Sequence, residues 1–92
     1  MKYEEIVGKK VIDKKARLLG KVYEVEINAK DLKITNFYLD VDKDAVNDLG
    51  LKKPIIGSVK AIFPTEMVDA ISDSILLNGI ISELKNIIKP LS

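Results

Sequence analysis

Four closely spaced aspartates in the middle of the chain are the first residues that could do chemistry. Asp40, Asp42, Asp44 and Asp48 have the spacing of the first, third, fifth and ninth positions of a calcium-binding loop. The spacing does not make a calcium-binding loop, because Ala45 replaces the glycine of the sharp turn and Leu51 occupies the position of the bidentate glutamate. Asp42 and Asp44 are better suited to the N-terminus of a short helix. The sequence therefore predicts no metal site.

The carboxylates of Glu24 and Glu26 could in principle serve general acid–base catalysis. They alternate with apolar residues in a predicted strand, so both should face solvent, where nothing raises one pKa above the other. The chain has no histidine and no cysteine, which removes the commonest general base, the commonest metal ligand and any thiolate nucleophile. It also has no glycine-rich phosphate loop and no serine flanked by glycines. We therefore expect no enzymatic activity and no cofactor.

A basic run near the N-terminus is the strongest charge feature. Its members, interrupted only by Asp13, are Lys9, Lys10, Lys14, Lys15, Arg17 and Lys21. Such a patch could meet RNA phosphates or an acidic protein surface. The alternative is a solvated turn whose lysines discourage sheet-to-sheet aggregation. We favour the solvated turn, because no exposed aromatic side chain is predicted beside the cations to stack on bases.

The composition indicates one small folded domain. The chain has 92 residues, of which 47% are hydrophobic and 32% charged, and its net charge is +1. This balance argues against a generic nucleic-acid binder and against a disordered tail. The apolar runs are too short to span a membrane, charged residues break up the N-terminus, and disulfides are absent. We therefore expect a soluble cytoplasmic protein without a transmembrane segment.

Alternating apolar and polar residues predict short strands in the first half of the chain. The first covers residues 9–12, and the second covers residues 21–27 with Tyr23, Val25 and Ile27 on its inner face. A turn over residues 28–31 leads to a strand from about residue 33 to residue 41, which places Phe37, Leu39 and Val41 inward. These two longer strands should form a meander.

The second half of the chain continues this pattern after an interruption. Asp42 can cap a short helix over residues 43–49, which Gly50 would end. A strand over residues 58–63 shares Val59, Ala61 and Phe63 on one face. Pro64 then begins a tight turn, and residues 70–77 form a small hairpin. Five or six short strands of this kind predict a mostly β fold, a small and partly open barrel or curled sheet.

The last segment changes to a helical period. Asn78 can cap a helix through Lys89, and Pro90 would stop it. One face of this helix carries an apolar stripe of Ile80, Ile81, Leu84, Ile87 and Ile88. The stripe could pack on the chain's own barrel, pair with a second subunit in a two-fold dimer, or lie on a membrane surface.

Two groups of short motifs resemble the PRC-barrel domain family. The first group is Gly8–Asp13, Leu19–Val22 and Val25–Ile27, and the second is Val59–Pro64, Met67–Val68 and the apolar strand Ser74–Leu77. The resemblance covers about residues 6–78, and it is closest to the stand-alone archaeal members. It departs at Ser72, where members usually carry a glycine before the aspartate. We accordingly divide the chain into a barrel over residues 1–78 and an added helix over residues 79–92.

The resemblance implies a partly open β-barrel that is not an enzyme and that acts by docking onto protein. Members occur in a photosynthetic reaction-centre subunit, in a bacterial ribosome-maturation factor and as archaeal cell-division adaptors, and stand-alone forms often dimerise. The first hypothesis is therefore a homodimeric adaptor in archaeal cell division or a membrane-associated assembly. The alternative is a ribosome- or RNA-associated factor that uses the basic run. A third hypothesis is a structural protein whose main role is to form its own dimer interface.

Overall fold

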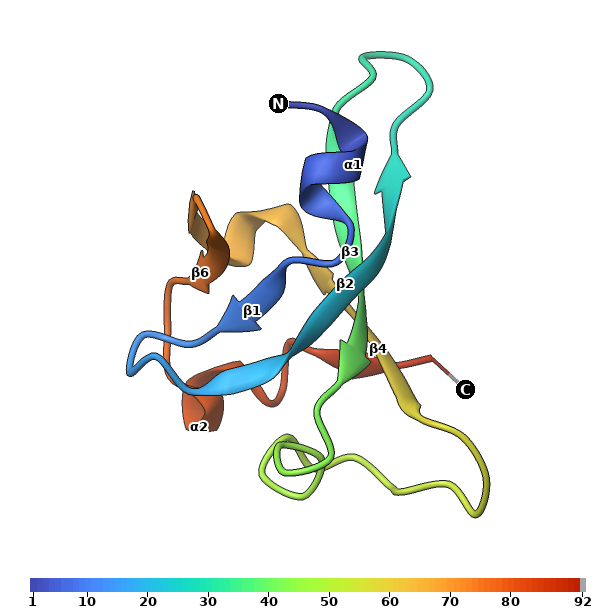
Figure 1. The fold of residues 1–92 in the computed structure, drawn as a ribbon, viewed down its shortest axis with the longest axis vertical. Helices are drawn as coiled ribbons and strands as arrows, with labels where there is room; N and C mark the ends of the chain where they lie inside the picture. Colours follow the sequence, from blue (N-terminus) through green and yellow to red (C-terminus); the bar gives the residue numbers. More distant parts are fainter. Residues whose placement is uncertain (92) are drawn as a thin grey trace.

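The computed structural model describes residues 1–91, and its strands lie side by side in one curled sheet (Figure 1). The elements are α1 (Tyr3–Ile6), β1 (Lys10–Ile12), β2 (Leu18–Ile27), β3 (Ile34–Val41), β4 (Val59–Pro64), a 3-10 turn (Thr65–Met67), β5 (Val68–Ile71), β6 (Ser74–Leu77), α2 (Ile81–Leu84) and β7 (Lys89–Pro90). In the described residues the strand order is β5-β6-β1-β2-β3-β4-β7. The end strands β5 and β7 do not pair with each other, so the sheet curls without closing. The prediction of a mostly β, partly open barrel is confirmed.

Strand pairing combines local hairpins with two pairings between distant strands, β1 with β6 and β4 with β7. β2, β3 and β4 pair antiparallel with their neighbours, as the predicted meander requires. The small hairpin of β5 and β6 is also confirmed. β6 then lies parallel to β1, with Val11 opposite Ile75. This pairing bends the sheet around a single core.

The core lies on the inner faces of β3 and β4. The predicted inward residues of β3 and of β4 are all buried, and the Phe37 and Phe63 rings stack with centroids 5.3 Å apart. Phe37 and Phe63 are also register partners across the two strands. Strict alternation along both strands puts each aromatic ring on the same inner face.

The predicted inner face of β2 is wrong at two of its three residues. Register shifts lie between Val22 and Glu24 and between Glu26 and Ile27. Val22 and Val25 are buried, whereas Tyr23, the extra residue of the first shift, and Ile27, at the end of the strand, are 37% and 49% exposed. An extra residue turns the side chains that follow it to the opposite face, which is why Val22 and Val25 share the inner face although they are three positions apart. Tyr23 therefore lies on the outer surface of the sheet, 6.0 Å from the Tyr38 ring.

Gly20 allows β2 to cross close to β3. A Cβ atom at this position would lie 2.1 Å from the carbonyl oxygen of Asp40, which belongs to the neighbouring backbone. No side chain fits such a gap. The absence of a side chain at Gly20 is thus what lets the sheet curl tightly here.

The segment from Asp42 to Leu51 is a series of turns, and the helix predicted over residues 43–49 is wrong. Asp42 accepts the amide of Asp44 through its side chain, and Gly50 has a left-handed φ of 71° as the predicted stop. Aspartates compete with helical hydrogen bonds in this way, and a segment this short is not helical without help. Ala45, Val46 and Leu49 are nevertheless buried in the core, which holds the turns in place.

The C-terminal segment returns to the sheet, so the helix predicted from Asn78 to Lys89 is wrong beyond Leu84. α2 is a single turn, and Asn78 lies outside it with its side chain donating to the Glu66 carbonyl at 2.9 Å. β7 instead pairs with β4, and the amide of Leu91 donates to the Lys60 carbonyl at 2.9 Å. Pairing satisfies polar groups that the edge of β4 would otherwise leave open.

Candidate functional site

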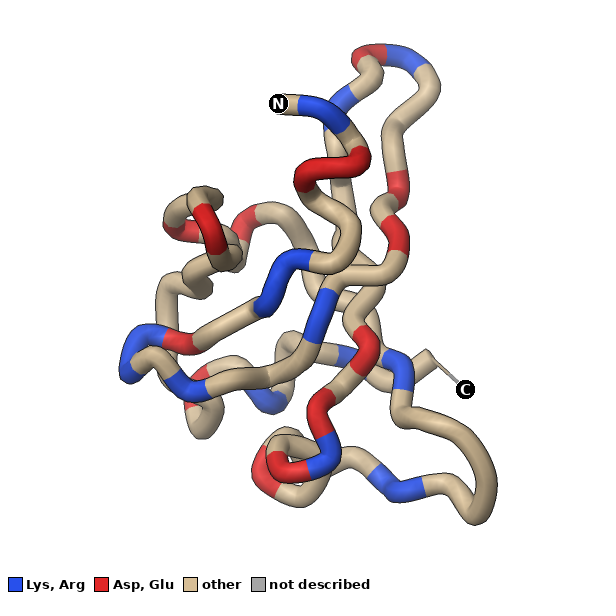
Figure 2. Tube along the Cα trace, in the orientation of Figure 1, with Lys and Arg blue, Asp and Glu red and all other residues tan. Residues whose placement is uncertain are grey.

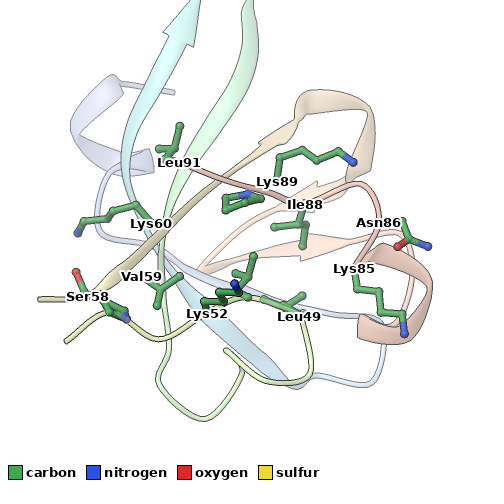
Figure 3. A pocket seen from close by; sticks show the side chains of 14 residues that line it. Leu49, Lys52, Ser58, Val59, Lys60, Lys85, Asn86, Ile88, Lys89 and Leu91 are labelled. Carbon is green, nitrogen blue, oxygen red and sulfur yellow. The ribbon is translucent and has the colours of Figure 1, made fainter. Parts of the chain in front are cut away.

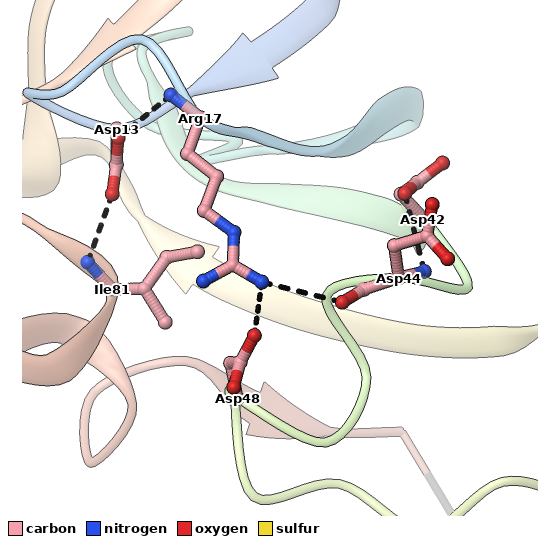
Figure 4. Close-up of polar contacts among 6 residues, drawn as sticks. All are labelled: Asp13, Arg17, Asp42, Asp44, Asp48 and Ile81. Carbon is pink, nitrogen blue, oxygen red and sulfur yellow. Dashed lines mark hydrogen bonds and ion pairs between the residues drawn. The ribbon is translucent and has the colours of Figure 1, made fainter.

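Asp13 fastens the turn between β1 and β2 to the start of α2. One carboxylate oxygen accepts the amide of Lys15 at 2.9 Å. The same oxygen accepts the amide of Arg17 at 2.9 Å, and the other accepts the amide of Ile81 at 3.1 Å (Figure 4). Its side chain is almost fully buried. The sequence showed Asp13 only as an interruption in a basic run, because its distant partner Ile81 gives no local signal. The residue has a structural role.

The six cations of the basic run do not form one patch. Arg17 pairs with the carboxylate of Asp48 and donates to the Asp44 carbonyl at 3.3 Å (Figure 4). Lys10 lies opposite Lys21 in the β1–β2 pairing. The cations of the strands and those of the turn therefore gather in two places (Figure 2). Lys14 and Lys15 remain exposed at the turn, and Lys9 is half-buried.

Three of the four aspartates of the middle segment engage their carboxylates, each with a different partner. Asp48 pairs with Arg17, Asp42 accepts a backbone amide, and Asp40 pairs with Lys60 at 3.2 Å. Within residues 1–91, no group of three or more acidic, histidine or cysteine side chains is arranged to hold a metal ion.

Glu24 and Glu26 lie on the exposed outer surface of β2, and both accept hydrogen bonds there. The hydroxyl of Tyr3 donates to Glu24, which lowers the pKa of that carboxyl and raises the pKa of Tyr3. Loss of hydration raises the pKa of nearby Tyr38. A general acid needs the opposite shift in its carboxyl. This surface therefore does not have the electrostatics of an acid–base pair.

An open groove lies between the loop that follows Leu51 and the C-terminal segment (Figure 3). Its volume is about 570 Å³, and it lies within the range usual for ligand pockets. The apolar side chains that line it are Leu49, Leu51, Pro54, Val59, Ile88, Pro90 and Leu91. The groove thus has a mainly apolar floor, built by two segments that are distant in the sequence.

Lysines surround this floor and no acidic residue lines the groove. The four are Lys52, Lys60, Lys85 and Lys89 (Figure 3). Lys60 pairs with Asp40 and lies 4.6 Å from the centre of the Tyr23 ring. The other three have no ion-pair partner among the described residues. The groove therefore carries positive charge that residues 1–91 do not neutralise.

Two isoleucines occupy the loop tip between two residues of the groove wall, and this tip is called the mouth of the groove, although neither isoleucine lines it. Ile55 and Ile56 are 102% and 88% exposed and lie between Pro54 and Ser58, which both line it. The surrounding loop extends away from the sheet (Figure 1). These two isoleucines are not among the predicted site residues. The signal available was an apolar pair between Pro54 and Gly57, two residues that favour a loop.

The predicted C-terminal stripe does not form one surface. Ile81, Leu84 and Ile88 are buried against the chain's own core, and Ile80 is half-buried. Ile87 is 44% exposed, because the helix ends before it. Three of the five residues are therefore inaccessible to a second subunit. Among residues 1–91, no helix has the length and apolarity needed to cross a membrane.

Comparison with protein-family models gives a match. The family model described as PRC-barrel domain matches residues 1–84, which is most of the chain. The match confirms the resemblance inferred from the sequence and extends it at both ends, through α1 and α2. Residues 85–91, which supply part of the groove, lie beyond it. No curated protein matches the chain.

Proposed function

The chain belongs to the PRC-barrel domain family, and from that premise we propose that it is a non-enzymatic module that docks onto another protein. Domains of this family are commonly protein-interaction modules. The observation that carries the proposal is the lysine-rimmed apolar groove with Ile55 and Ile56 exposed at its mouth.

The exposed isoleucines favour docking over a purely structural role. Fully exposed, adjacent aliphatic side chains at a loop tip gain nothing from the fold, whereas apolar side chains at an interface are removed from water. The groove next to them lacks a nucleophile–base pair or a perturbed carboxyl, which a catalytic cleft would need. Both features support a binding surface without chemistry of its own.

The context of this docking follows from the family resemblance. We propose a cytoplasmic adaptor in an archaeal cell-division or membrane-associated assembly, acting as a homodimer. The dimer interface would lie outside the predicted stripe, because Ile81, Leu84 and Ile88 are already buried. Sedimentation equilibrium of the full chain tests the dimer. A monomer at all concentrations would refute both the homodimeric adaptor and the purely structural dimer.

An RNA-associated factor is the second candidate, and the β2 bulge favours it. The bulge exposes Tyr23 beside Tyr38 and Lys60, so an aromatic pair and a cation share the outer surface of the sheet. Bases stack on such surfaces in single-stranded RNA binders. The docking function has priority because the lysines of the basic run are divided and Arg17 is engaged with Asp48.

Photo-crosslinking in native cells separates these functions. A photoreactive residue replaces Ile56 in one protein and the exposed Asp69, on β5, in a matched control. We expect discrete protein adducts from position 56 that resist ribonuclease and are absent from position 69. Adducts that ribonuclease removes would support the RNA-associated factor. No adduct at position 56 would refute docking through this groove.

A further inference from the structure

We propose that the groove between residues 51–58 and residues 85–91 binds a short segment of a partner protein that carries both aliphatic side chains and carboxylates. This inference rests on the proposed docking function and deepens it by specifying the chemistry of the partner. It follows from the floor of the groove, its rim, and the strand edge beside it.

The floor selects aliphatic side chains. Leu49, Val59 and Ile88 form its base and Leu91, 41% exposed, lies at one side (Figure 3). Leu49, Val59 and Ile88 are themselves at most 8% exposed, so the apolar surface that a bound segment would remove from water here is chiefly that of Leu91. Ile55 and Ile56 can add to this contact from the mouth of the groove. Residues 52–58 lie outside helices and strands and make no backbone–backbone hydrogen bond that would hold the loop in place. The loop is thus free to close over a bound segment.

The rim selects carboxylates. Lys52, Lys85 and Lys89 have no ion-pair partner among the described residues, and Lys60 has only Asp40. Four lysines around an apolar floor, with no acidic residue lining it, give a positive potential to which an acidic segment is complementary. A neutral or basic aliphatic segment would satisfy the floor but not the rim.

The same charges argue against self-association through the exposed loop. In a second copy, the apolar pair Ile55–Ile56 is preceded by Lys52 and Lys53. Inserting that loop into the groove would bring these lysines against Lys85 and Lys89. Like charges in contact oppose such a pairing. The favoured occupant is therefore a segment of another protein.

Recognition would use side chains more than strand addition. β7 is the end strand on this side of the sheet, and Leu91 donates its amide inward to Lys60. Amides along a strand alternate in direction, so position 90 faces outward, where proline has no N–H to donate. Pro90 thus weakens strand addition at the free edge of β7. The specificity for the bound segment therefore comes from the side chains of the floor and the rim.

Selection from a phage-displayed library of random twelve-residue peptides on the full chain tests the inference. We expect recovered peptides to be enriched in Asp or Glu together with Leu, Ile or Val. The best peptide is then synthesised and titrated by fluorescence anisotropy against the wild type and two double variants, Lys85→Ser/Lys89→Ser and Ile55→Ser/Ile56→Ser. Lys14→Ser/Lys15→Ser is the matched control, since both lysines are exposed on the distant β1–β2 turn.

The lysine variant should weaken binding by about tenfold and reduce its salt dependence, since an exposed ion pair contributes up to about fivefold. The isoleucine variant should weaken binding by about tenfold or more through lost apolar burial. The control should leave the affinity unchanged. All variants alter exposed residues, and circular dichroism confirms that they fold.

Four results would overturn the inference. These are the absence of acidic–aliphatic enrichment, peptides that bind the groove variants as tightly as the wild type, self-association that the variants abolish, and flotation with phosphatidylserine–phosphatidylcholine vesicles that the variants abolish. The last two would assign the groove to a second copy or to an anionic lipid surface. Protein adducts at position 56 without acidic–aliphatic enrichment would preserve the docking function while refuting this partner chemistry. Enrichment without such adducts would refute the docking function in cells.

Discussion

The turn between β1 and β2 and the loop between Leu51 and Val59 are both exposed, lysine-bearing connections, yet the protein holds them in opposite ways. The turn is fastened by buried Asp13, which accepts three backbone amides. The loop has no such fastening, and its isoleucines face solvent. The exposed lysines of the turn therefore belong to a connection that hydrogen bonds hold in place. Those of the loop lie beside exposed apolar side chains. Binding regions are usually drawn from the less fixed parts of a fold.

Replacing Gly20, in β2 just after the turn, and Gly57, in the loop, should give the largest difference. Gly20→Ala brings a Cβ atom to 2.1 Å from the Asp40 carbonyl oxygen, so we expect a loss of at least about 3 kcal/mol in unfolding free energy, or no folding at all. Gly57→Ala meets open space at φ +90°, and should cost only about 1–2 kcal/mol of backbone strain. Urea denaturation measures both, and equal losses would contradict the contrast.

Removing the fastening carboxylate should destabilise the protein strongly. Asp13→Ala leaves the amides of Lys15, Arg17 and Ile81 without their acceptor, which should cost about 3 kcal/mol of unfolding free energy. Asp69→Ala, at an exposed position, should change it by less than about 0.5 kcal/mol. Thermal and urea unfolding provide the measurement. A small effect of Asp13→Ala would mean that water replaces the carboxylate and that the turn is not fastened.

Two neighbouring isoleucines test how the C-terminal wall of the groove is built. Ile88→Ala should cost about 2–4 kcal/mol because Ile88 is 1% exposed in the core, whereas Ile87→Ala should cost less than about 1 kcal/mol. A continued helix would place both on one buried stripe. Similar losses in urea unfolding would therefore support that helix and contradict the return of β7 to the sheet.

The smallest expected effect is at the loop tip. Ile55→Ser/Ile56→Ser should change the unfolding free energy by less than about 0.5 kcal/mol, because both side chains are exposed. Ile75→Ser, at a fully buried position, is the positive control and should destabilise strongly. A loss of unfolding free energy above about 1 kcal/mol in the tip variant would show that the loop packs on the rest of the fold. The turn and the loop would then not differ in the way described above.

Local pattern predicted the central part of the fold correctly. β3 and β4 are buried on one face and obey a strict period of two, so their inner residues could be identified from spacing alone. Phe37 and Phe63 are the clearest cases. The same reasoning failed in β2, where a bulge that has no reliable sequence signal turned Tyr23 outward and a second register shift precedes the exposed Ile27.

Distant pairing decided the parts that could not be predicted. Residues 80–88 have a helical period, but an available edge on β4 draws residues 89–91 into the sheet and ends α2 early. Tertiary contacts override a short helical preference in this way. The groove escaped prediction for the same reason, because its walls meet only after β7 has paired. Asp13 likewise acquires its role from Ile81, 68 positions away.

The parallel pairing of β1 with β6 also sets an order of events during folding. Strands β1 to β4 each pair with the next strand along the chain, so these pairings close smaller loops than any contact with the C-terminal part. The pairing of β1 with β6 must come later, because Val11 meets Ile75 only after the chain has turned back past the whole meander. Contacts of such long separation form slowly. We therefore expect the meander to form first and the bond from the Ile81 amide to Asp13, which joins residues 68 positions apart, to form near the end of folding.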